Sequence, residues 1–153
     1  MTRLVLPVAL AAALVAAGCG GKSRLSRAEF VQRANAICVK YEQKVTRAMA
    51  GINPGDQSQL AGAIDKALPV IREGNDKLRA LAPPKQLQNQ YDRWLKIADD
   101  EVAAATQLRD ALKSKDAREM QRAFQKLQAS DAGQDRIARA DLGLSRCVST
   151  SSG

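Results

Sequence analysis

The chain has 153 residues, a formal net charge of +8 at pH 7 and no histidine, and aromatic residues make up 3% of it. The lack of histidine removes the side chain that most often serves as a general base or metal ligand. The sequence also lacks the spacings typical of a Walker loop, a serine-hydrolase elbow, a zinc metalloprotease, a CxxC redox centre and an EF-hand. We therefore expect no enzymatic activity, no cofactor and no metal.

The N-terminal segment predicts export. An apolar run of fourteen residues, 4–17, follows Arg3, and it is shorter than the roughly 20 residues that a membrane-spanning helix needs. We expect residues 1–18 to be a signal peptide that is removed. The rest would comprise a lipidated tether (19–25), one helical bundle domain (26–147) and a disordered tail (148–153).

Residues 14–19, Leu-Val-Ala-Ala-Gly-Cys, resemble the lipobox of bacterial lipoproteins. The resemblance implies that Cys19 carries a diacylglyceryl group and that cleavage follows Gly18. The chain differs from the usual pattern at Ala16, where leucine is common. The resemblance implies a protein that is anchored by lipid to the extracytoplasmic face of the cell membrane.

Three cysteines in an exported chain leave an odd thiol unless one of them is modified. With Cys19 lipidated, Cys38 and Cys147 remain, and outside the cytosol we expect them to form a disulfide. In the chain-entropy model, a bridge over this separation contributes about 4 to 5 kcal/mol. Two buried, reduced thiols are the alternative.

Basic residues gather next to the proposed anchor. Residues 22–47 contain seven Lys and Arg against two Glu. Each basic side chain held near an anionic leaflet contributes on the order of 1 kcal/mol, so anionic lipid or a wall polymer is a possible partner. A solvated helix face is the alternative. Nucleic acid is not expected, because the chain is exported and its basic residues are not interleaved with exposed aromatics.

The chain then predicts two helices with a single apolar stripe each. Ser26 and Glu29 have the spacing of a capping box and should begin the first helix. Asp56 should cap the second, which contains Pro69 and Gly74. Because proline removes an interior hydrogen bond, we expect a kink near Pro69, with two collinear helices as the alternative.

Two further helices follow the Pro83-Pro84 pair. The third carries Tyr91 and Trp94 on its stripe, and with Tyr41 and Phe124 they are the aromatic residues that could stack in the core. The fourth should be capped by Ser114 or Asp116. Its apolar stripe, which includes Met120, Ala123, Phe124 and Leu127, is interrupted by polar residues and Gly133 before it resumes at Ile137.

The sequence thus predicts an all-α protein, an antiparallel four-helix bundle with helix two kinked near Pro69. Cys38 should lie roughly 20 Å below the top of the first helix. A straight fourth helix that descends from Asp116 to Gly143 would place Cys147 too low to reach it. We therefore expect that this helix breaks near Gly133, that its last residues turn back, or that the helices are offset.

Beyond the lipobox, three short segments resemble a group of small secreted or lipid-anchored helical proteins of high-GC Gram-positive bacteria. They are Ala-Asn-Ala-Ile-Cys at 34–38, Leu-Ala-Pro-Pro at 81–84 and Gly-Leu-Ser-Arg-Cys at 143–147. The resemblance implies a helical fold and a disulfide between Cys38 and Cys147. It implies no activity.

Two functions fit these observations. The first is a lipid-anchored envelope protein that acts as a binding or scaffold module. The alternative is a small-ligand or cation-binding protein that uses the polar gap of the fourth helix, where Asp131, Gln134 and Asp135 lie within about one turn. Ordinary surface pairing of these carboxylates with Arg136 and Arg139 would also explain them.

Overall fold

The computed structural model describes residues 23–148, and within them the protein is all-helical, as predicted. Helix α1 spans Arg27–Ala48, α2 Gln57–Arg79, α3 Gln88–Ser114 and α4 Ala117–Arg136. A 3-10 turn, η1, covers Lys85–Leu87, and a π-helical segment, η2, covers Ile137–Leu142 and extends α4. The predicted signal peptide, Cys19 and all but the first residue of the predicted tail lie outside the described residues.

The helix starts follow from local capping groups. Ser26 begins α1 with the full capping box, because its side chain accepts from the Glu29 N–H and the Glu29 carboxylate accepts from the Ser26 N–H at 3.0 Å. Asp56 and Asp116 each accept two backbone N–H groups in the first turns of α2 and α4. Asp116, and not Ser114, is therefore the cap of the fourth helix.

Helix α2 runs without a break through Pro69 and Gly74. The alternative of two separate helices is therefore wrong. A Cβ atom at Gly74 would lie 3.0 Å from Cγ of Tyr41, so the glycine lets the Tyr41 ring of α1 lie directly against the α2 backbone. Glycine is unfavourable inside a helix, but at position 74 it allows α1 and α2 to approach closely.

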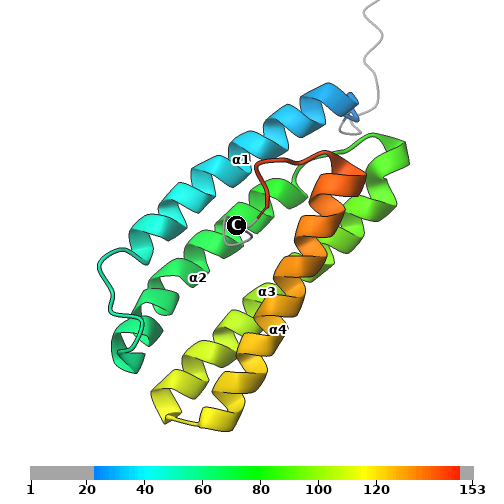
Figure 1. Ribbon diagram of the computed structural model, residues 1–153. Helices are drawn as coiled ribbons and strands as arrows, with labels where there is room; N and C mark the ends of the chain where they lie inside the picture. The colour runs from blue at the N-terminus through cyan, green and yellow to red at the C-terminus, as the bar shows by residue number, and fades with distance from the viewer. Residues whose placement is uncertain (1–22, 149–153) are drawn as a thin grey trace, which may run out of the picture.

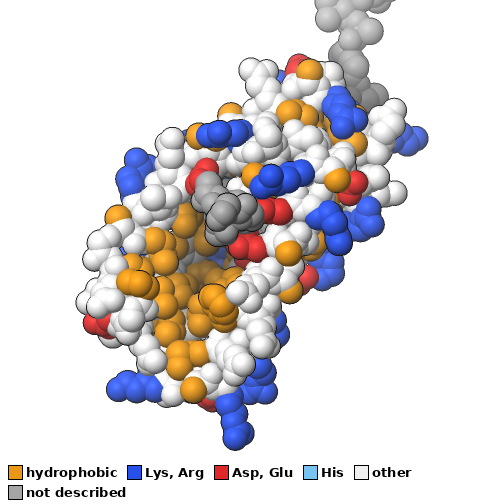
Figure 2. All heavy atoms as spheres, viewed as in Figure 1, with side chains coloured by type: hydrophobic (Ala, Val, Ile, Leu, Met, Phe, Trp, Pro, Cys, Tyr) orange, Lys and Arg blue, Asp and Glu red, His pale blue; other side chains and the backbone are white. Residues whose placement is uncertain are grey.

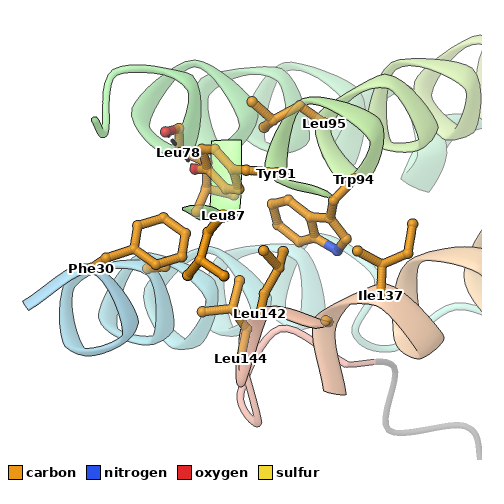
Figure 3. Close-up of a cluster of buried hydrophobic side chains, with 11 residues drawn as sticks. Phe30, Leu78, Leu87, Tyr91, Trp94, Leu95, Ile137, Leu142 and Leu144 are labelled. Carbon is orange, nitrogen blue, oxygen red and sulfur yellow. Dashed lines mark hydrogen bonds between the residues drawn. The ribbon is translucent and has the colours of Figure 1, made fainter. Parts of the chain in front are cut away.

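The helices pack in chain order, α1 on α2, α2 on α3 and α3 on α4, and the connections between them are short (Figure 1). The buried apolar residues form two separate clusters. The larger one joins α1, the end of α2, η1, α3 and η2 around Phe30, Tyr91 and Leu142 (Figure 3). The smaller one joins the start of α2 to the end of α3 around Leu68 and Leu112.

Aromatic stacking occurs in the larger cluster. Tyr91 stacks on Trp94 with ring centroids 5.8 Å apart, and Phe30 meets Tyr91 edge to face at 4.9 Å. The Tyr91 hydroxyl donates to the Leu78 carbonyl at 2.6 Å, which satisfies it in the core. The expectation that Phe124 joins the core aromatics is wrong. Its side chain is 54% exposed, because α4 at that position faces solvent.

Cys38 and Cys147 form the predicted disulfide, with their Cα atoms 5.1 Å apart. Gly143, in the left-handed conformation at φ 73°, ends η2 beside Arg27 and Val31 in the first turns of α1. The helix therefore reaches the level where α1 begins, and the expectation that it descends and leaves Cys147 too low was wrong. The expected break near Gly133 is also wrong, since α4 continues through this residue. Beyond Gly143 the chain turns back along α1 and reaches Cys38 from the end where α1 begins, and not upward from below as expected (Figure 1).

Candidate functional site

A pocket of about 390 Å³ lies between the middle parts of the four helices and the C-terminal segment. Figure 2 shows it as a hollow lined mainly by hydrophobic side chains, with acidic side chains at one edge. We call it the central pocket, and it is lined by Ile37, Cys38, Tyr41, Glu42, Val45, Thr46, Ile71, Gly74, Asn75, Leu78, Trp94, Glu101, Asp131, Gln134, Arg146, Cys147 and Val148.

The interrupted stripe of α4 explains why the space is not filled. Over residues 128–136 the helix carries only polar side chains, Ala and Gly, so it presents no large apolar group to the opposite wall. At Gly133 an added Cβ would lie 3.3 Å from Cδ1 of Ile97, and the glycine thus keeps α4 close to α3. The apolar wall opposite comes from α1 and α2, including Ile37, Val45 and Ile71.

Glu101 is the acidic group at the polar end of the central pocket. It is partly buried on α3, and Nε2 of Gln134 donates to its Oε2 at 2.7 Å. Burial, together with the nearby charges of Asp131 and Asp135, raises the pKa of the Glu101 carboxyl to about 7, although the hydrogen bond from Gln134 acts to lower it. A carboxyl with this pKa changes its charge near neutral pH.

The structure separates the predicted site residues. Asp131 and Gln134 line the central pocket, whereas Asp135 is not among its lining residues and lies 3.8 Å from Nη2 of Arg139. Surface ion pairing was the alternative explanation for the carboxylates of α4, and the contact with Arg139 supports it for Asp135. The central pocket brings Asp131 and Gln134 together with Glu101, a residue that we did not predict.

Glu101 could have been found from its spacing. It belongs to an acidic run of three whose other members diverge on the helix: Asp99 pairs with Arg79 at 2.7 Å and Asp100 with Lys96 at 3.0 Å. Glu101, however, follows the buried Ala98 by three residues, and Ala105 follows Glu101 by four. It therefore lies on the inward-facing stripe of α3, at the level where the stripe of α4 becomes polar.

The C-terminal segment forms one edge of the central pocket through Arg146, Cys147 and Val148. The disulfide holds this segment on α1, and the Arg146 N–H donates to Oδ1 of Asn35 at 2.9 Å. Val148 packs on the larger core cluster. The bridge predicted from cysteine parity thus also fixes part of the wall of the pocket.

Trp94 lines the pocket from the side of the larger cluster, and its side chain is 2% exposed. Its Nε1 is buried and has no hydrogen-bond partner within residues 23–148; in Figure 3 the nitrogen lies on the side toward Ile137. An unsatisfied buried donor of this kind costs about 1 to 3 kcal/mol. Since Trp94 is the only tryptophan of the chain, its fluorescence reports on this wall specifically.

Residues 23–148 contain no group of three or more Cys, Asp or Glu side chains placed to hold a metal ion. Within these residues, no metal-binding cluster supports the hypothesis of a cation-binding protein. None of the helices described is both long and apolar enough to span a membrane.

The chain matches no protein-family model, and no curated protein and no solved structure is significantly similar to it.

Proposed function

We propose that the protein is a binding protein of the cell envelope, anchored by lipid on Cys19, that takes up a small ligand in the central pocket. The observation that carries the binding function is the pocket itself. Its volume of about 390 Å³ falls in the range of about 300–1,000 Å³ typical of small-molecule sites. Its walls are mainly apolar, with a few polar groups at one end, which is the usual composition of such sites.

The chemistry of the central pocket supports binding in preference to catalysis. The polar end offers a carboxyl and an amide, Glu101 and Gln134, already hydrogen-bonded to each other at 2.7 Å. The two sulfurs on its edge are joined in the disulfide and so do not supply a nucleophilic thiol. These groups can orient a ligand, and the apolar wall can remove it from water.

The proposed location at the membrane is supported by two features of the N-terminal part of the chain. The lipobox-like residues 14–19 support lipidation of Cys19 on the extracytoplasmic face, and the excess of Lys and Arg over residues 22–47 supports contact with anionic lipid or wall polymer. A scaffold that uses this surface and has no ligand is the competing proposal.

The proposal also includes the finer architecture. We infer an antiparallel order of the four helices, which the short connections support. We infer a bend in α2 at Pro69, because proline lacks the N–H that would bond to the preceding turn.

The experiment follows Trp94 fluorescence while 1-octanol is titrated into the mature chain, with Cys19→Ser keeping it free of lipid. We expect saturable binding that changes the emission and raises the melting temperature. Val45→Phe should fill part of the pocket and abolish this response. Val39→Phe is the matched control, since Val39 lies on the same helix but does not line the central pocket.

A response that is absent in the parent chain, or that survives Val45→Phe as well as Val39→Phe, would contradict a ligand site in the central pocket. The competing scaffold proposal would then be favoured, because it predicts no saturable response to a small apolar probe.

A further inference from the structure

We infer, on the basis of the binding function proposed above, that the ligand of the central pocket carries a positively charged amine on an apolar body. The Glu101 carboxylate would be the counter-ion of the amine. The apolar body would lie on the wall formed by α1 and α2, where Ile37, Val45 and Ile71 line the pocket.

The charges around the pocket support this ligand class. Its lining residues include three acids, Glu42, Glu101 and Asp131, against one base, Arg146. The chain as a whole carries a formal charge of +8, so the pocket has the opposite sign from the rest of the protein. A concave site of one charge, with low-dielectric walls, concentrates ligands of the opposite charge.

The neighbours of Glu101 are such that a bound cation would stabilise its carboxylate form. The charged neighbours that act on it in the described part of the chain, Asp131 and Asp135 on α4, are both acidic. Its Oε2 accepts from the neutral amide of Gln134. From the other elements, Glu42 of α1 and Arg146 of the C-terminal segment face the same pocket, and α2 contributes the uncharged Asn75.

An amine in the pocket would offset the repulsion among these acids. Partly buried carboxylates interact more strongly with a charge than exposed ones, because less water screens them. The pKa of Glu101 is raised to about 7, so the pocket makes the charged carboxylate less favourable than it is in water, and a cation beside it would offset this cost. The amine should therefore bind more tightly at pH 8, where Glu101 ionises readily, than at pH 5.5.

The test compares octylamine with 1-octanol, which share one hydrocarbon chain, by calorimetry on the mature chain with Cys19→Ser. We expect octylamine to bind at least tenfold more tightly at pH 8, and this advantage to fall at pH 5.5. Glu101→Gln should remove most of this advantage, because it should weaken the binding of octylamine far more than the binding of 1-octanol. Asp99→Asn is the matched control on α3, since Asp99 pairs with Arg79 outside the pocket, and it should keep the advantage.

The outcomes separate this inference from the function on which it rests. Equal binding of octylamine and 1-octanol would overturn the inference and leave the binding function standing. Tighter binding of octanoate than of octylamine would also overturn it, because Arg146 would then be the residue that selects the ligand charge. Binding of none of the three probes would overturn both.

Discussion

At the level of single residues, the raised pKa of Glu101 makes a prediction about stability. In the folded chain its pKa is about 7, against 4.5 for the unperturbed group. Between these values the folded state binds more protons than the unfolded state, so the free energy of unfolding falls as pH rises through this window. Below about pH 4.5 both states are protonated and the full stability is present.

Glu101→Gln should remove this pH dependence, because glutamine resembles the protonated acid. We expect the variant to exceed the parent chain in stability by about 1 to 3 kcal/mol at pH 8 and to equal it at pH 4. Urea unfolding at pH 4, 6 and 8 measures the difference. Asp99→Asn, on the exposed side of α3, is the control. An offset that is the same at every pH would show that packing, and not ionisation, causes the change.

The polar gap in the stripe of α4 was visible in the sequence because that signal is local. Asp131 and Gln134, two of the residues that interrupt the stripe, line the central pocket, and their role as a ligand site stays a prediction. Glu101 was not predicted because a run of three acids is typical of a solvent-exposed segment, although its spacing from Ala98 and Ala105 places it on the inward-facing stripe of α3. The residues that approach it from α4 are determined by the packing of the two helices, which is a property of the tertiary structure.

At the level of elements, α2 provides a matched pair of glycines. A Cβ at Gly62 would have no atom within 4 Å, whereas a Cβ at Gly74 would lie 3.0 to 3.2 Å from Cγ, Cβ and Cδ1 of Tyr41. Alanine in a helix interior is favoured over glycine by about 0.8 to 1.0 kcal/mol. Tyr41 resists displacement because its hydroxyl donates to Glu73 at 2.6 Å.

We therefore expect Gly62→Ala to stabilise the chain by about 0.5 to 1 kcal/mol and Gly74→Ala to destabilise it by about 1 to 3 kcal/mol through overpacking. Denaturant unfolding of the two variants measures both changes on one helix. In a Tyr41→Ala background, Gly74→Ala should no longer destabilise the chain, and a double-mutant cycle measures this coupling. Equal stabilisation by both alanines would show that Tyr41 moves aside freely.

The starts of the helices were predictable and the end of α4 was not. Ser26, Asp56 and Asp116 cap their helices through contacts within three residues, so the sequence contains all the information. The π-helical turns of η2 instead bring Ile137, Ala138 and Leu142 into the larger core cluster. Contacts with α1 and α3, distant in sequence, determine that geometry.

At the level of the whole molecule, the two ends of residues 23–148 are held at different places on the domain. The C-terminal segment is held on the middle of α1 by the disulfide. The N-terminal end is held at the turn between α2 and α3, where the Leu25 N–H donates to the Ala82 carbonyl at 2.9 Å and Nη1 of Arg24 donates to Pro83 and Gln88. The chain therefore leaves the folded domain toward Cys19 from this end of the bundle.

This exit point gives the proposed anchor a geometric consequence. Ser23, the first described residue, is four positions after Cys19, and an extended chain covers at most about 3.6 Å per residue. A lipid on Cys19 would therefore keep Ser23 within about 15 Å of the membrane surface, and the α2–α3 turn is the part of the domain next to it. The basic residues near this end would lie within about two Debye lengths of anionic lipid at physiological ionic strength.

The diacylglyceryl group proposed on Cys19 has two acyl chains, which together should give stable membrane association where a single chain binds weakly. We expect the protein, expressed with its own N-terminus in a Gram-positive host, to remain in the membrane fraction at 1 M salt. Cys19→Ala should move most of it to the soluble fraction, because salt screens the remaining contribution of the basic residues. Ser23→Ala is the neighbouring control and should leave the distribution unchanged. If Cys19→Ala stays in the membrane fraction at 1 M salt, the lipid anchor is wrong and protein partners must hold the domain there.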